Sequence, residues 1–171
     1  MIMQLFKKKK ELGFERTYSA PVDLVWRAWT EADMLREWWG PEKTMVPECD
    51  IDARVGGRIR VVTEATAEMG KYQGTRWPME GTFTVVDEKV RLTYEARSWT
   101  EGEEDGTTIE HVNELTFASG DSGGRTTVTL NVTIHKIGPK AKMAAFGMKW
   151  GYKQQLDKLE ELLAKRSAAG N

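Results

Sequence analysis

The sequence predicts a single α+β domain, in which a curved antiparallel sheet of about seven strands wraps around one long C-terminal helix. Apolar residues recur with a period of two between residues 46 and 134, which is typical of strands. After Gly138-Pro139 the period becomes 3.6 and stays so through residue 165, which indicates a helix. One long helix and one sheet bury their apolar faces together when the sheet curls around the helix.

The length and composition fit one domain. A chain of 171 residues buries roughly 70% of its unfolded surface on folding, and a hydrophobic fraction of 40% is ordinary for a globular domain. We expect the domain over residues 13–165, between an N-terminal arm at 1–12 and a disordered tail at 166–171. No internal repeat and no second domain are indicated.

One strand and two short helices are expected before the main run of strands. Residues 14–18 alternate and include aromatic and β-branched members, which predicts a strand. Ala20-Pro21 opens a helix, because the missing N–H of proline would be unpaired in the first turn. Thr30, with Asp33 three residues later, predicts a capping box that starts a second short helix. Gly40-Pro41 ends that helix.

Six further strands follow, separated by turns rich in glycine and acidic residues. Residues 65–78 form a longer loop, whose Met69, Tyr72 and Trp77 are expected to cover part of the domain. The expected strands are 46–53, 57–64, 79–86, 90–98, 107–117 and 125–134.

The final helix carries a single apolar stripe, and charged residues occupy its other faces. At 1.5 Å per residue its about 25 residues span roughly 38 Å, so a broad sheet must lie beneath it. The members of the stripe are Met148, Tyr152, Leu156, Leu159 and Leu163.

Charge and cysteine content bear on the class of protein. A net charge of −1 gives no general attraction to nucleic acid or to an anionic membrane, and lysines 7–10 are interpreted as a solvated arm.

Cys49 is the only cysteine, so no intrachain disulfide framework exists, and its strand-like setting predicts a small buried hydrophobe. No segment approaches the ~18 apolar residues of a membrane span. The terminal lysines follow the apolar residues, which is the wrong order for a secretory signal, and we expect a cytoplasmic protein.

The motifs along the chain resemble those of a known family in their order and spacing. They are Ala20-Pro21-Val22, Val25-Trp26-Arg27-Ala28-Trp29-Thr30, Trp38-Trp39-Gly40-Pro41, Asp52-Ala53-Arg54-Val55-Gly56-Gly57, Glu80-Gly81-Thr82-Phe83, Arg91-Leu92-Thr93-Tyr94, Thr126-Thr127-Val128-Thr129-Leu130 and Gly151-Tyr152. Over residues 13–165 the chain resembles the START-like (SRPBCC, helix-grip) superfamily. More closely, it is similar to the family named after the homologue of the activator of the heat-shock-protein-90 ATPase.

The resemblance implies a deep cavity between the sheet and the long helix. Members of the superfamily bind lipids, hormones or polyketides, and some are cyclases or self-sacrificing resistance proteins. The family name also implies a co-chaperone or stress-related role. Residue alternation predicts which side chains face such a cavity from the sheet. They are Ile59, Val61, Met79, Phe83, Tyr94, Ile109, His111, Asn113, Val128 and Leu130.

Two polar residues stand out on this mostly apolar face. His111 and Asn113 could fix the orientation of a largely hydrophobic ligand, or they could bond each other, Tyr94 or a water inside a packed core. If they face a ligand, His111 is the one candidate for a general acid or base.

The tryptophans of the short helices are expected to plug the mouth of the sheet, with Trp38 or Trp39 reaching the edge of the cavity. On the long helix, Gly147 would leave space and a methionine would supply an adaptable wall. The helix residues expected at the cavity are Met143, Phe146, Gly147 and Trp150.

The prediction is therefore a protein that binds a small, mostly hydrophobic molecule between its sheet and its C-terminal helix. One alternative is a protein-interaction module that contacts a chaperone or a second copy of itself. Another is an enzyme of cyclase, dehydratase or hydrolase type that uses His111. His135 has no metal-ligand spacing to Cys49 or His111, and no phosphate loop or basic groove is present, so we expect no metal, cofactor or nucleic acid.

Overall fold

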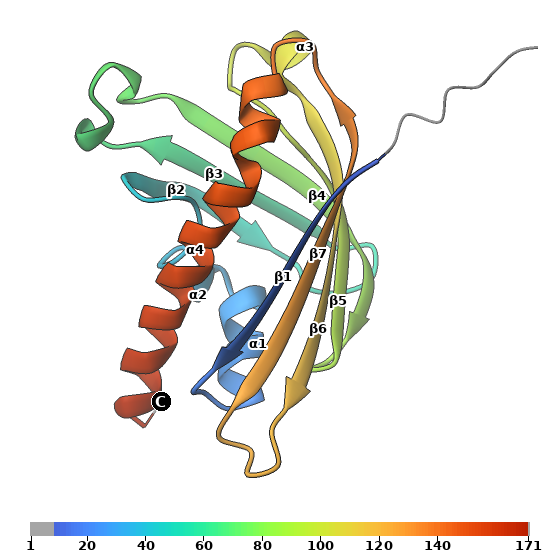
Figure 1. Cartoon of the computed structure of the whole chain (residues 1–171), viewed down its shortest axis with the longest axis vertical. Coiled ribbons are helices and arrows are strands. Elements are labelled where there is room, and N and C mark those ends of the chain that lie inside the picture. Colours follow the sequence, from blue (N-terminus) through green and yellow to red (C-terminus); the bar gives the residue numbers. More distant parts are fainter. Residues whose placement is uncertain (1–8, 171) are drawn as a thin grey trace, which may run out of the picture.

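The computed structural model describes residues 9–170 and confirms the expected fold class: one seven-stranded antiparallel sheet curls around a long C-terminal helix (Figure 1). The strands are β1 (Lys10–Tyr18), β2 (Thr44–Ile51), β3 (Arg58–Ala65), β4 (Arg76–Asp87), β5 (Arg91–Ser98), β6 (Ile109–Ser119) and β7 (Thr126–Ile137). The helices are α1 (Val22–Thr30), α2 (Ala32–Leu35), the 3₁₀ helix η1 (Ala67–Tyr72), α3 (Glu104–Thr107) and α4 (Lys142–Ala168).

The sheet order is β1-β7-β6-β5-β4-β3-β2, so β1 and β2 form its two edges. The connection through α1 and α2 takes the chain from one edge to the other, and α4 crosses the open side of the sheet (Figure 1). β1 lies along α4, since Phe14 packs against Tyr152 at 5.6 Å between ring centroids and Arg16 pairs with Asp157 at 2.7 Å.

Alternation along β6 and β7 follows the expected register. The inward side chains of both strands are buried in one core, while their neighbours along each strand are intermediate or exposed. Strict alternation from Phe83 would turn Val85 inward, but a β-bulge between Phe83 and Val85 changes the register in β4, and Val86 packs against the core instead.

A cluster of tryptophans fills the space between the sheet and the two short helices, as expected. Trp29 and Trp38 are 1% and 0% exposed and meet edge to face, with ring centroids 4.6 Å apart. The indole N–H of Trp38 donates to the carbonyl of Ala28 at 3.0 Å. The cluster is part of the hydrophobic core that also contains Leu156, Leu159 and Leu163 of α4.

The predicted capping box at Thr30 is wrong. Thr30 is the last residue of α1, and its hydroxyl donates to the carbonyl of Trp26 at 2.8 Å. The N-cap of α2 is Glu31, which makes no side-chain cap bond. The threonine hydroxyl therefore bonds back to the i−4 carbonyl in place of starting the next helix.

Several boundaries differ from the expected ones. β1 begins at Lys10, because its ladder with β7 extends to Ile134 and the Lys10 ammonium donates to the carbonyl of Ala145 at 2.7 Å. α4 continues to Ala168, past the expected end at residue 165. Residues 1–8 of the expected arm and Asn171 of the expected tail lie outside the described residues.

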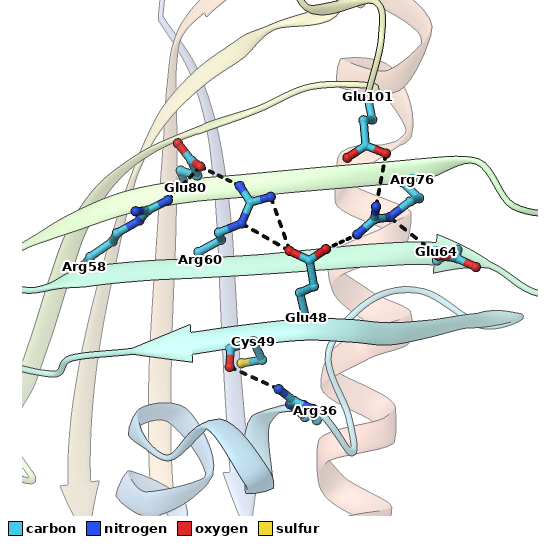
Figure 2. A network of polar contacts seen from close by, with 9 residues as sticks. All are labelled: Arg36, Glu48, Cys49, Arg58, Arg60, Glu64, Arg76, Glu80 and Glu101. Carbon is cyan, nitrogen blue, oxygen red and sulfur yellow. Dashed lines mark hydrogen bonds and ion pairs between the residues drawn. The ribbon is translucent and has the colours of Figure 1, made fainter.

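The outward side chains of β2, β3 and β4 form a network of ion pairs (Figure 2). Arg60 lies between Glu48 and Glu80, and Arg76 bonds Glu48 and also pairs with Glu64. The hydrogen bond from Arg76 holds the pKa of Glu48 below its usual range. Water screens these charges, so each pair contributes little to stability.

Candidate functional site

A cavity of about 390 Å³ lies between the sheet and the first half of α4. It lies toward η1 and α3, which contribute Met69 and Thr107 to its lining. Its apolar wall includes six methionine and tryptophan side chains from five different parts of the chain. They are Trp39, Met69, Trp77, Met79, Trp99 and Met148.

Trp77 on β4 and Trp99 just after the neighbouring strand β5 both line the cavity. β4 and β5 are paired, and the backbone N–H of Trp99 donates to the carbonyl of Pro78 at 3.1 Å just beyond the end of β5. Both rings are half-buried, and the guanidinium of Arg97 lies over the Trp99 ring at 4.8 Å from its centroid. The cavity therefore has rigid aromatic surfaces on the sheet side and adaptable methionines beside them.

A chain of four polar side chains runs from α4 to the cavity. The Tyr152 hydroxyl donates to Asn113 Oδ1 at 2.8 Å, and Asn113 Nδ2 lies 2.8 Å from His111 Nδ1. His111 Nε2 lies 3.0 Å from Ser98 Oγ. Tyr152, His111 and Ser98 line the cavity, whereas Asn113 is fully buried behind it.

The chain of bonds fixes the tautomer of His111. An amide nitrogen only donates, so Nδ1 of the neutral ring accepts from Asn113 and Nε2 carries the proton. Nε2 then donates to Ser98 Oγ. Burial lowers the pKa of His111 to about 4. Because His111 is already a donor toward Ser98, it is not arranged to remove the Ser98 proton.

Gln155 supplies a second polar group at the cavity. Its Oε1 accepts the backbone N–H of Gly40 at 3.1 Å, and the residue is 5% exposed. Its Nε2 is buried and has no hydrogen-bond partner among the described residues. A buried amide donor without a partner carries a cost of about 1–3 kcal/mol, which a bound acceptor would relieve.

Four of the residues expected at the site line the cavity: Trp39, Met79, Ile109 and His111. The other expected sheet and tryptophan residues are buried in the core and do not line it, because the tryptophan cluster and the C-terminal half of α4 fill their side of the gap. These core residues are Trp38, Ile59, Val61, Phe83, Tyr94, Asn113, Val128 and Leu130.

The helix residues expected at the cavity lie on its outer face. Met143, Phe146 and Trp150 are 80%, 78% and 63% exposed, and a Cβ at Gly147 would meet nothing within 4 Å. Met143 is nine positions from Tyr152, which is about half a turn out of phase at 3.6 residues per turn. The stripe through Tyr152 faces the sheet, so Met143, Phe146, Gly147 and Trp150 face away from it. This part of the prediction is wrong.

Several lining residues were missed, and some had a signal in the sequence. Met69 and Trp77 are apolar residues in the loop expected to cover part of the domain, and both line the cavity. Ser98 and Trp99 lie at the end of an expected strand, where alternation does not predict which face of the sheet a side chain occupies. Gln155 lies on the apolar stripe, three positions after Tyr152 and four before Leu159, so a polar residue there was a signal in the sequence.

The possible metal ligands, the single cysteine and the helices of the described residues each differ from what a metal, thiol or membrane-spanning site requires. No group of three or more His, Cys, Asp or Glu side chains between residues 9 and 170 could hold a metal ion. Cys49 is buried, and burial raises the pKa of its thiol to about 11. No helix among the described residues is both long and apolar enough to cross a membrane.

The fold and the cavity define a helix-grip protein with an internal apolar site. The chain belongs to the family described as "Activator of Hsp90 ATPase homolog 1-like protein", whose model matches residues 19–164.

Solved bacterial structures share this fold. A protein from Nitrosomonas europaea is 25% identical, with a TM-score of 0.68 over 92% of this chain and 96% of that chain. The AHSA1 protein from Silicibacter pomeroyi is 19% identical, with a TM-score of 0.69 over 92% and 99%. A protein from Mycobacterium smegmatis is 22% identical, with a TM-score of 0.70 over 90% of each chain. A comparison with curated protein sequences gave no match.

Proposed function

We propose that this protein binds a small, mostly hydrophobic molecule in the cavity beneath the first half of α4. The observation that carries the proposal is the cavity itself, about 390 Å³ with walls of tryptophan and methionine. Small-molecule sites of roughly 300–1,000 Å³ have this composition, with a few polar groups that orient the ligand.

The polar groups support binding more than catalysis. His111 is neutral, and its Nε2 proton already bonds Ser98, so the pair is not set up as base and nucleophile. The thiol of Cys49 is buried and protonated. An acid–base role for His111 would require it to break the bond with Ser98 and exchange protons with a bound substrate.

Native mass spectrometry of the purified protein tests the proposal. We expect the intact mass to exceed the denatured mass by one small molecule, and extraction of the protein should release an apolar compound. Protein from two expression conditions, each also offered a naphthalene-sized apolar probe, provides the control. An apo mass in every case, with no probe adduct, would contradict ligand binding.

A second candidate function is binding to a chaperone of the Hsp90 class, as the family name suggests. The observation that favours it is the exposed stripe Met143, Phe146 and Trp150 on the outer face of α4. Lys149 and Lys153 are exposed beside this stripe, and Lys153 lies over the Trp150 ring at 5.3 Å from its centroid. A partner surface with an apolar patch and carboxylates around it would complement the stripe.

Serine substitution separates this candidate from ligand binding. We expect Phe146→Ser to weaken binding to a purified Hsp90 chaperone by tenfold or more, since exposed aromatic anchors dominate interfaces. Met45→Ser removes another exposed apolar side chain, on the edge strand β2, and should leave that affinity unchanged. Calorimetry gives both affinities. Equal affinities for the two variants, or no binding by the wild-type protein, would remove the candidate.

A further inference from the structure

We infer that the cavity selects molecules that carry a carbonyl or similar hydrogen-bond acceptor, because Ser98, which lines it, keeps a donor hydrogen and the buried amide nitrogen of Gln155 in its wall has no partner among the described residues. The inference rests on the proposed binding function and adds a chemical class to it. Two independent features lead to it: the direction of the hydrogen-bond chain that ends at Ser98, and the free amide of Gln155.

The hydrogen-bond chain runs in one direction and ends at Ser98, which lines the cavity. Tyr152 donates to Asn113, Asn113 donates to His111, and His111 donates to Ser98. Ser98 Oγ therefore accepts at one lone pair and keeps its own hydrogen. No other side-chain bond to Ser98 Oγ exists among residues 9–170, so this hydrogen is available to a molecule in the cavity. Bonds aligned in one direction polarise each other, which strengthens the last donor.

Gln155 contributes a donor from the opposite wall. Gln155 lies on α4, whereas Ser98 lies at the end of β5. The bond from Gly40 N–H fixes the orientation of the amide, because only Oε1 can accept it. Nε2 is therefore left with both hydrogens and no partner in the described part of the chain, in a side chain that is 5% exposed.

Charge at the cavity completes the description. The titratable side chains that line it are His111, Lys140 and Tyr152, and no aspartate or glutamate of the described residues lines it. His111 is neutral at pH 7 because burial lowers its pKa to about 4. A ligand ammonium would therefore find no carboxylate partner and would lose its hydration, which is costly. The site suits an apolar ring system with a hydrogen-bond acceptor and without a cation.

Three probes of one shape test this inference. 2-Acetylnaphthalene carries a carbonyl, 2-isopropenylnaphthalene replaces the oxygen by a methylene group, and 1-(2-naphthyl)ethylamine carries a cation at pH 7. Calorimetry should give a dissociation constant about tenfold lower for the ketone than for the alkene, as one net hydrogen bond provides. The amine should bind more weakly than either of the other two.

Substitutions identify the donor. Ser98→Ala and Gln155→Met each remove one donor, and at least one of them should reduce the ketone's advantage to twofold or less without weakening the alkene. Gln154→Met is the matched control, because Gln154 accepts the backbone N–H of Glu42 in the same way but does not line the cavity. This control should keep the full preference for the ketone.

The outcomes separate the inference from the proposed function. Equal affinities for ketone and alkene in the wild-type protein would overturn the acceptor preference and leave apolar binding standing. A preference that survives both Ser98→Ala and Gln155→Met would overturn the assignment of the donors. Failure of all three probes to bind would overturn the proposed function itself.

Discussion

Replacing Gly151 by leucine is expected to weaken the binding of 2-acetylnaphthalene by roughly 10- to 100-fold. Gly151 lines the cavity, and a Cβ placed there would meet nothing within 4 Å. A leucine side chain at this position would occupy space that the probe needs, and overpacking of such a site costs about 1–3 kcal/mol. Isothermal titration of the variant and the wild-type protein measures the loss.

Gly147→Leu is the matched control for this experiment. Gly147 lies one turn earlier on α4, also with nothing within 4 Å of a Cβ, but it does not line the cavity. Both substitutions replace a helix glycine and should raise the free energy of unfolding by about 0.8 kcal/mol. The probe's affinity should therefore fall in Gly151→Leu alone. An equal affinity in the two variants would place the binding site elsewhere.

Acidification from pH 7 to pH 5 is expected to lower the free energy of unfolding by about 2 kcal/mol through His111 alone. Burial lowers the folded-state pKa to about 4, against about 6.5 in the unfolded chain. The unfolded state therefore binds the proton more readily between these values. The contribution of His111 to the free energy of unfolding is fully present above pH 6.5 and falls as the pH drops. Below pH 4 the whole contribution, about 3 kcal/mol, is lost.

Urea unfolding at a series of pH values measures this dependence. His111→Gln lacks the titrating ring and should show a nearly flat free energy of unfolding from pH 7 to pH 5. His135→Gln removes the other histidine, which is exposed on β7, and should keep the wild-type slope. The same slope in the wild-type protein and in His111→Gln would contradict a buried neutral His111.

The fold was predictable because its signals are long and periodic. The switch from a two-residue to a 3.6-residue period separates the sheet from α4. Alternation also placed His111 and Asn113 on the inward face. Short-range signals were weaker: Thr30 and Asp33 match a capping box, yet the Thr30 hydroxyl bonds the carbonyl of Trp26.

The cavity was only partly predictable, because an inward side chain need not face empty space. Val128 and Leu130 point inward as expected, but the tryptophan cluster and the C-terminal half of α4 cover them. Where the gap stays open depends on the packing of elements that are distant in the sequence. The direction of the α4 side chains, however, could have been predicted from the helical period. Because Tyr152 belongs to the apolar stripe, Met143 must lie on the opposite face of the helix.

The crystal structure of the protein with 2-acetylnaphthalene tests the central claim most directly. Our account predicts the naphthalene ring between α4 and the sheet, against Trp77 and Trp99, with its carbonyl oxygen ~3 Å from Ser98 Oγ or Gln155 Nε2. Density for the probe only on the outer face of α4, beside Phe146, or no bound probe at saturating concentration, would contradict it.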